Sequence, residues 1–203
     1  MDTNKKLPLY KLCINPDEDD LTGVTIISLV NEPAIERNFQ TFSKQKDLQF
    51  AIQDEEMQIV SGAIMVADMP IFRRDPDTKE EYNVVADKNT IYQIVQKFFK
   101  TNRTSSVDTQ HNGMLVNGVY LFESFIIDSK RGINAPTGYG DLSDGSWFGS
   151  FKVESPDIWN EIKAGTFKGF SIAGLFDYAK ISMKKEKTEL QLFKDLKEVL
   201  KNV

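Results

Sequence analysis

The sequence predicts a strand-dominated α+β domain with a few helices and an amphipathic helix at its C-terminal end. Short apolar and β-branched runs recur along the chain between turn residues, which is typical of strands. Three other segments repeat apolar residues every three or four positions, which is typical of helices. The chain has 203 residues, and 40% of them are hydrophobic, which suffices for one sizeable core. We therefore expect one domain over residues 1–180 and a charged helical tail over 181–203.

Apolar runs bounded by turn residues mark the expected strands. The run 24–30 is rich in β-branched residues, and the polar stretch 31–33, which ends in a proline, terminates it. The other expected strands are 57–66, 119–127, 147–153 and 168–178.

Two helices are expected to begin at N-capping residues. Asp87 precedes the first, and Ser155 precedes the second, where Pro156 occupies the first helical position. The residues that form their apolar faces are Ile91, Ile94, Val95 and Phe98 in the first helix and Ile158, Trp159 and Ile162 in the second. The apolar face of the tail helix comprises Leu192, Phe193, Leu196, Val199 and Leu200.

Polar segments separate these elements. Residues 14–20 and 68–80 carry many charges or prolines and are expected to be loops, and the polar segment 101–110 leads into His111. The segment 129–146 is rich in Gly, Ser, Asp and Pro, so we expect a long loop there. Long loops in compact domains often carry function.

The composition excludes several classes of function. The net charge is −5 and the sequence pI is about 5.1, which argues against a protein that binds nucleic acid through phosphate contacts. Cys13 is the only cysteine, so neither an internal disulfide nor a thiolate metal cluster is expected, and a reducing compartment such as a cytosol fits. No stretch approaches the ~20 apolar residues of a membrane span, and the start of the chain does not resemble a secretory signal. We expect no metal and no cofactor.

His111 is the only histidine, and Ser171 follows it within the run 168–174. A serine hydroxyl becomes a useful nucleophile when a base takes its proton, and the imidazole group suits that task near neutral pH. If the chain is a serine hydrolase of this kind, its general base is His111. A structural or surface role for a lone histidine stays open as the other interpretation.

Strand alternation in 168–178 places Ser171 on the opposite face from the bulky Phe170 and Ile172. The residues near the hydroxyl are small, which leaves room for a substrate chain. Gly169 and Gly174 permit close approach of the backbone, although Ala173 replaces the second glycine of the G-x-S-x-G nucleophile motif. A tight strand end without catalytic meaning is the alternative.

Glu123 lies in a run that is apolar on both strand faces, so we expect its carboxylate to be partly buried and to need a partner. An imidazole is one such partner, because a carboxylate that orients the histidine completes a catalytic triad. Glu123 is therefore the candidate third member, with Asp128 and Asp177 as rivals. An exposed edge-strand glutamate paired with a lysine is the alternative.

Three stretches together resemble the phage serine proteases of XkdF type, which are relatives of the prohead (capsid maturation) proteases. The most specific stretch runs from 145 through 172 and contains the Gly-Phe-Ser sequence around Ser171. The other two are 27–34, Ile-Ser-Leu-Val-Asn-Glu-Pro-Ala, and 119–126, Val-Tyr-Leu-Phe-Glu-Ser-Phe-Ile. The resemblance spans residues 22 to 178.

The resemblance implies an assemblin-like fold, as in the herpesvirus proteases: a β-barrel flanked by helices. It places the nucleophile at Ser171 and the general base at His111. In the larger prohead protease family the Ser-Leu-Val-x-x-Pro-Ala motif follows the nucleophile and has an acid two residues before its serine. Here the motif comes first, as if the order were permuted, and Ile26 stands in the acid's place. The third triad member is therefore not carried over.

The expected function is a phage head maturation serine endopeptidase that cleaves scaffold or major capsid proteins inside the assembling prohead in the host cytoplasm. A homodimer is implied only by the herpesvirus analogy. The alternative is a catalytically inactive protein of the same fold that binds scaffold during capsid assembly. Neither function involves nucleic acid or a membrane.

Overall fold

The computed structural model describes residues 7–33, 49–75, 77–139 and 142–181. Within these residues the fold is α+β and dominated by strands, as the sequence predicts, with two α-helices. The strands are β1 (Leu9–Cys13), β2 (Gly23–Val30), β3 (Ala51–Asp54), β4 (Ile59–Met65), β5 (Ile71–Arg74), β6 (Glu81–Val85), β7 (Val107–Thr109), β8 (Val119–Ile126), β9 (Trp147–Val153), β10 (Gly169–Leu175) and β11 (Asp177–Ile181). The helices are α1 (Lys88–Lys100) and α2 (Pro156–Lys163), and a 3₁₀ turn covers Ser129–Arg131.

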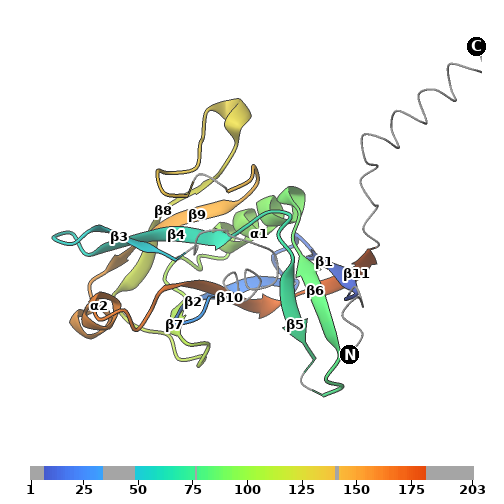
Figure 1. The fold of residues 1–203 in the computed structure, drawn as a ribbon, viewed down its shortest axis with the longest axis horizontal. Helices are drawn as coiled ribbons and strands as arrows, with labels where there is room; N and C mark the ends of the chain where they lie inside the picture. The colour runs from blue at the N-terminus through green and yellow to red at the C-terminus, as the bar shows by residue number, and fades with distance from the viewer. Residues whose placement is uncertain (1–6, 34–48, 76, 140–141, 182–203) are drawn as a thin grey trace, which may run out of the picture.

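The strands of the described residues form three sheets. Their orders are β11-β1-β6-β5, β10-β2-β7 and β3-β4-β9-β8. β10 leads into β11 across Phe176, so one nearly continuous stretch of chain joins the first sheet to the second (Figure 1). A closed barrel needs every strand to pair on both sides, and in each of these sheets the outer strands pair on one side only. The expected closed barrel is therefore absent from the described residues. The assemblin-like fold and the permuted order stay predictions.

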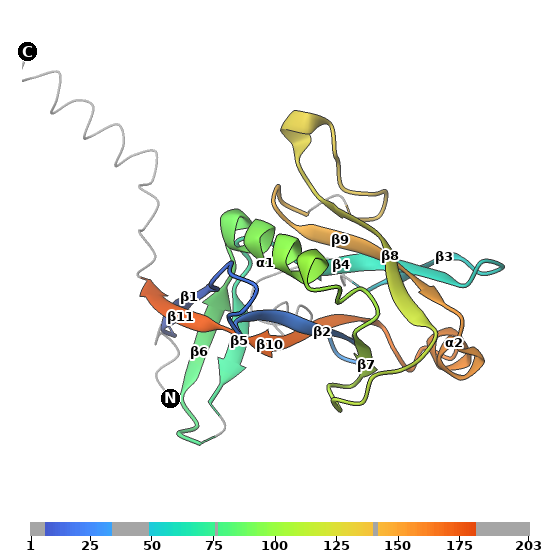
Figure 2. The same ribbon diagram turned by 180° about the vertical axis from the view of Figure 1, so that it is seen from behind.

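The core lies where the second and third sheets and α1 meet. Phe98 of α1 contacts Trp147 of β9 with ring centroids 5.2 Å apart, and Phe151 of β9 contacts Phe170 of β10 at 4.5 Å. All four side chains are almost completely buried. In the view from behind, α1 runs alongside β2 (Figure 2). Phe170 is thus fixed between the sheets, which anchors the strand that carries Ser171.

The strongest sequence signals gave the right elements. The expected strands at 24–30, 57–66, 119–127 and 147–153 correspond to β2, β4, β8 and β9. Both expected N-caps are present: the Asp87 side chain accepts a hydrogen bond from the Thr90 N–H at 2.9 Å, and the Ser155 hydroxyl accepts one from the Ile158 N–H at 3.4 Å. Capping satisfies backbone donors that the first helical turn leaves unpaired.

Several short strands were not expected. β5 lies inside the segment 68–80, which was expected to be a loop, and β7 lies inside the polar segment 101–110. The expected strand 168–178 is divided into β10 and β11, which belong to different sheets. These strands form because a neighbouring strand supplies their hydrogen-bond partners, a long-range effect that local composition does not report.

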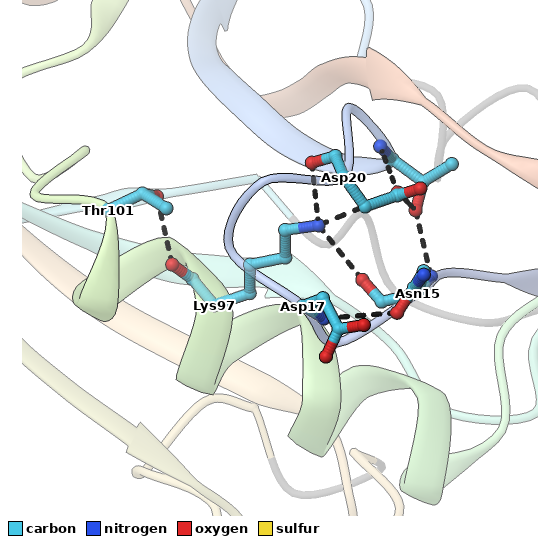
Figure 3. Close-up of polar contacts among 6 residues, drawn as sticks. Asn15, Asp17, Asp20, Lys97 and Thr101 are labelled. Atoms are coloured by element: carbon cyan, nitrogen blue, oxygen red, sulfur yellow. Dashed lines mark hydrogen bonds and ion pairs between the residues drawn. The ribbon is translucent and has the colours of Figure 1, made fainter.

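Lys97 ties the acidic loop 14–20 to α1 (Figure 3). Its ammonium group donates hydrogen bonds to the carbonyl oxygens of Asn15 at 2.8 Å and Asp20 at 2.9 Å, and it lies 3.7 Å from the Asp20 carboxylate. The Lys97 side chain is only 8% exposed. This lysine therefore organises the loop as a buried cation, while the loop remains an irregular segment as expected.

The structure bears only in part on the expectations about the tail helix and about membrane-spanning segments. The tail helix and its apolar face over 192–200 lie outside the described residues, and the boundary at 180/181 stays a prediction. Across the part of the chain that the structure covers, no helix is both long enough and apolar enough to span a bilayer.

Removing the cap of α1 is expected to lower stability by about 1 kcal/mol at neutral pH, as measured by urea denaturation of Asp87→Ala. Burial acts to raise the pKa of Asp87, but hydrogen bonds from Lys11 and Thr90 outweigh it and hold the pKa below its usual value. Because the folded-state pKa is lowered, this carboxylate contributes stability above its unfolded pKa of about 3.9 and loses it as the pH falls through the folded value.

Asp87→Asn is the matched control, since asparagine also caps helices. It is expected to retain most of the cap at neutral pH, and its deficit against the wild type is expected to shrink below about pH 4. A deficit independent of pH would contradict this role of the charge.

Candidate functional site

Three polar side chains form a row across the second sheet. Ser171 of β10 is paired with Ser28 of β2, and Ser28 is paired with Asp108 of β7. Residues directly opposite each other on neighbouring strands point to the same face of a sheet. Ser171 is 8% exposed, Ser28 is 0% exposed and Asp108 is 1% exposed. A row of buried polar groups is costly unless the groups serve one another or a ligand, so this row is the candidate site.

His111 reaches this row from the turn after β7. Its Nδ1 atom lies 2.9 Å from the Ser28 hydroxyl oxygen, within hydrogen-bond distance. His111 is an exposed residue. Ser28 thus contacts His111 and is the cross-strand neighbour of Ser171, and its strand lies between β10 and β7.

The turn that presents His111 has an unusual backbone. Gln110 and His111 both have positive φ angles, 55° and 57°, in the left-handed region. Two such non-glycine residues in succession are uncommon, and strained conformations of this kind cluster at functional sites. The Gln110 N–H donates a hydrogen bond to the Leu29 carbonyl at 2.9 Å, which fixes the turn against the strand that carries Ser28.

Asp108 closes the same turn. Its Oδ2 atom accepts a hydrogen bond from the Gly113 N–H at 2.8 Å. Its Oδ1 atom is buried and has no hydrogen-bond partner among the described residues. Asp108 thus holds the segment around His111 while one carboxylate oxygen remains unpaired on the face shared with Ser28.

A small cavity borders Ser171 on the side of the first sheet. Its volume is about 60 Å³, and its lining is mostly apolar, with Leu12, Ile64, Val84 and Phe176 among its walls. Arg73 contributes the one cationic side chain of the lining. A cavity of this size and character suits a small apolar group next to the serine.

The structure places Glu123 in the third sheet. It is an exposed residue of the edge strand β8, so the expected partial burial is wrong. Its carboxylate accepts a hydrogen bond from the Ser150 hydroxyl at 2.5 Å, and among the described residues no hydrogen bond or ion pair joins it to His111. The alternative prediction, an exposed glutamate on an edge strand, is confirmed for its position. Its partner, however, is Ser150 and not a lysine. The triad role of Glu123 stays a prediction.

The two rival acids lie elsewhere in the fold. Asp128 pairs with Arg131, whose Nε atom is 2.8 Å from the carboxylate, and this hydrogen bond lowers the pKa of Asp128. Asp177 is exposed on β11, opposite Cys13 of β1. Among the described residues neither forms a hydrogen bond or an ion pair with His111, and their roles stay predictions.

Sequence reasoning missed Ser28 and Asp108 as site residues. Ser28 is a polar residue inside an apolar strand, and Asp108 precedes the lone histidine by three positions. The first of these signals could have been read as a buried hydroxyl in need of a partner. In the described part of the chain, no group of three His, Cys, Asp or Glu residues is placed to hold a metal ion.

Comparisons with known proteins bear on this site. Residues 47–180 match the family described as "Putative phage serine protease XkdF", a span that includes Asp108, His111 and Ser171 and begins after Ser28. The phage-like element PBSX protein XkdF of Bacillus subtilis (strain 168) is 26% identical over 150 residues, covering 71% of this chain and 44% of the relative.

The uncharacterized protein YqbD of the same organism is 25% identical over 187 residues, covering 88% of this chain and 52% of the relative. The chain thus spans about half the length of these curated relatives. No solved structure matches. The family match covers well over half of the residues, and the chain therefore belongs to the family described as "Putative phage serine protease XkdF".

Proposed function

We propose that the chain is a serine endopeptidase in which Ser171 is the nucleophile and His111 is the general base. The observation that carries the proposal is the hydrogen bond between His111 and Ser28, the direct cross-strand neighbour of Ser171. Membership of a phage serine protease family supports the same chemistry. Ser28 is the less suitable nucleophile because it is 0% exposed in the central strand, whereas Ser171 is 8% exposed and lies on an edge strand.

The proposed reaction has two balanced halves. The Ser171 Oγ atom attacks the carbonyl carbon of the scissile peptide as Nε2 of His111 takes the hydroxyl proton. The imidazolium then gives that proton to the leaving amine, and the C–N bond breaks to leave an acyl ester on Ser171. Water, deprotonated by the same imidazole, hydrolyses the ester and returns the serine hydroxyl.

The position of β10 favours an extended substrate. β10 is an edge strand of its sheet, and extended peptides bind proteins by adding a strand to such an edge. The cavity beside Ser171 would then accept a small apolar side chain close to the scissile bond. We propose phage scaffold and major capsid segments as substrates, cleaved inside the assembling prohead in the host cytoplasm, in keeping with the resemblance to the prohead proteases.

The test is covalent labelling of the purified chain with a fluorophosphonate probe, which modifies activated serine hydroxyls. Labelling is expected at Ser171, located by mass spectrometry of the digested protein, and is expected to be lost in Ser171→Ala. Ser129→Ala is the matched control: Ser129 bonds Asp144 in an exposed loop, and its replacement is expected to leave labelling unchanged.

Co-expression with the head proteins separates the two candidate functions. Cleavage of scaffold or capsid protein by the wild-type chain, and its absence with Ser171→Ala, supports the endopeptidase. Unchanged processing with Ser171→Ala overturns it. Binding of scaffold without any cleavage or probe labelling would identify the inactive assembly protein instead.

A further inference from the structure

The His111 ring contacts a hydroxyl where serine proteases commonly use a carboxylate. Among the described residues, the side-chain hydrogen-bond partner of the imidazole is Ser28, whose Oγ atom lies 2.9 Å from Nδ1. We infer that Ser28 is a positioning residue that takes the place of the triad acid. In this arrangement the Asp108 carboxylate supports Ser28 as a hydrogen-bond acceptor. This inference rests on the proposed function, because it assigns a role to Ser28 in the same reaction.

The direction of the hydrogen bond follows from the chemistry of a neutral imidazole. Such a ring carries one N–H and one nitrogen lone pair, and a base that accepts the Ser171 proton at Nε2 must carry its own proton at Nδ1. The Nδ1–H group then donates to Ser28 Oγ. This bond keeps the ring in the reactive tautomer, and it strengthens when the ring becomes an imidazolium, since hydrogen bonds from charged donors are stronger than neutral ones.

Burial favours the same assignment. A hydroxyl that is 0% exposed in the central strand of a sheet costs free energy unless it is hydrogen-bonded. His111 supplies that bond from a turn whose two left-handed residues hold the ring over β2. A strained turn is expected here if its role is to hold the His111 ring in position.

Asp108 is placed to support Ser28. The register pairs Ser28 with Asp108, and neighbouring strands lie about 4.8 Å apart. A serine hydroxyl that accepts a hydrogen bond from His111 can also donate one, and Asp108 Oδ1 is a buried acceptor without a partner in the described residues. We assign Oδ1 as the acceptor of the Ser28 O–H when the imidazolium forms. β2, β7 and β10 carry one ionisable side chain between them, that of Asp108.

The lone histidine makes the tautomer directly measurable. Nitrogen-15 NMR of the full chain labelled at histidine reports one imidazole, which is His111. The wild type is expected to carry its neutral-form proton at Nδ1, and Ser28→Ala is expected to shift it to Nε2, the form that free imidazole side chains prefer. Ser124→Ala is the matched control: Ser124 accepts a hydrogen bond from Trp147 in another sheet, so its replacement is expected to leave the tautomer unchanged.

Kinetics supply the second readout. Ser28→Ala is expected to lower kcat about 10- to 100-fold with little change in KM, because the lost hydrogen bond acts mainly in the transition state. Ser28→Thr keeps the hydroxyl and is expected to recover most of kcat. Asp108→Asn is expected to lower kcat while the tautomer remains at Nδ1.

The outcomes separate this inference from the proposed function. Probe labelling at Ser171 together with an Nε2–H tautomer in the wild type, or with an identical tautomer in Ser28→Ala, overturns the role of Ser28 and leaves the protease intact. Absence of labelling with the expected tautomer overturns the protease, and with it the catalytic meaning of the contact. If Ser28→Ala does not fold, Ser28→Thr and the wild-type tautomer still decide the matter.

Discussion

Replacing His111 is expected to reduce the rate of proteolysis by about a thousandfold or more, with little change in stability. The loss follows because no second histidine exists to act as base, and an unactivated serine hydroxyl is a poor nucleophile. His111→Asn is the best variant, since asparagine tolerates the left-handed backbone at φ 57° better than alanine. The measurement is kcat on a peptide substrate, with the melting temperature of each variant as the check on folding.

The neighbouring residue provides a matched control. Gln110 has the same left-handed backbone, and its side-chain oxygen accepts a 3.4 Å hydrogen bond from the Asn31 N–H. Gln110→Asn changes the same turn without touching the imidazole, so kcat is expected to stay within a few-fold of the wild type. Retention of more than about a tenth of the rate by His111→Asn would exclude His111 as the general base.

Replacing Lys97 by methionine is expected to lower the free energy of unfolding by about 2–4 kcal/mol. Methionine fills a similar volume but cannot donate hydrogen bonds, so the carbonyl oxygens of Asn15 and Asp20 lose their charged donor. These oxygens are partly buried where the acidic loop covers α1, so an acceptor deprived of its charged partner there destabilises the fold. Urea denaturation measures the change.

Lys100 offers the control from the same helix. Its ammonium group lies 2.9 Å from the carboxylate of Glu18 in the same loop, but both side chains are more than half exposed, at 61% and 53%. Exposed ion pairs contribute little because solvent screens them, so Lys100→Met is expected to cost less than about 0.5 kcal/mol. Equal destabilisation by the two variants would mean that burial of Lys97 does not strengthen its contacts.

The sequence allowed prediction of the elements whose signals are local. β9 is continuous and apolar, and its bounds were predicted; α1 has a cap and an apolar face, and its first residue was predicted from the cap at Asp87. β7 was missed because Val107-Asp108-Thr109 is short and polar, and its parallel pairing with β2 decides its conformation. The division of the strands among three open sheets likewise depends on long-range pairing, which periodicity does not encode.

The candidate site was predictable in its chemistry more than in its geometry. A lone histidine and one serine in a glycine-flanked strand identified His111 and Ser171 as candidates for a hydrolase, and their catalytic roles stay predictions; the structure places Ser28 in contact with His111 and opposite Ser171. Ser28 and Asp108 were missed because their importance arises from cross-strand register. Glu123 was expected to be buried because its neighbours are apolar, but β8 is an edge strand, where one face and one side remain open to water.

The passage of β10 into β11 has a mechanical consequence. β11 is held by β1, and the chain leaves this ladder at Ile181, ten positions after Ser171. A pull on that end is transmitted along one extended run of backbone to the β10–β2 ladder. Because successive side chains alternate in direction, slippage of that ladder by a single position would turn the Ser171 hydroxyl to the reverse side, away from His111.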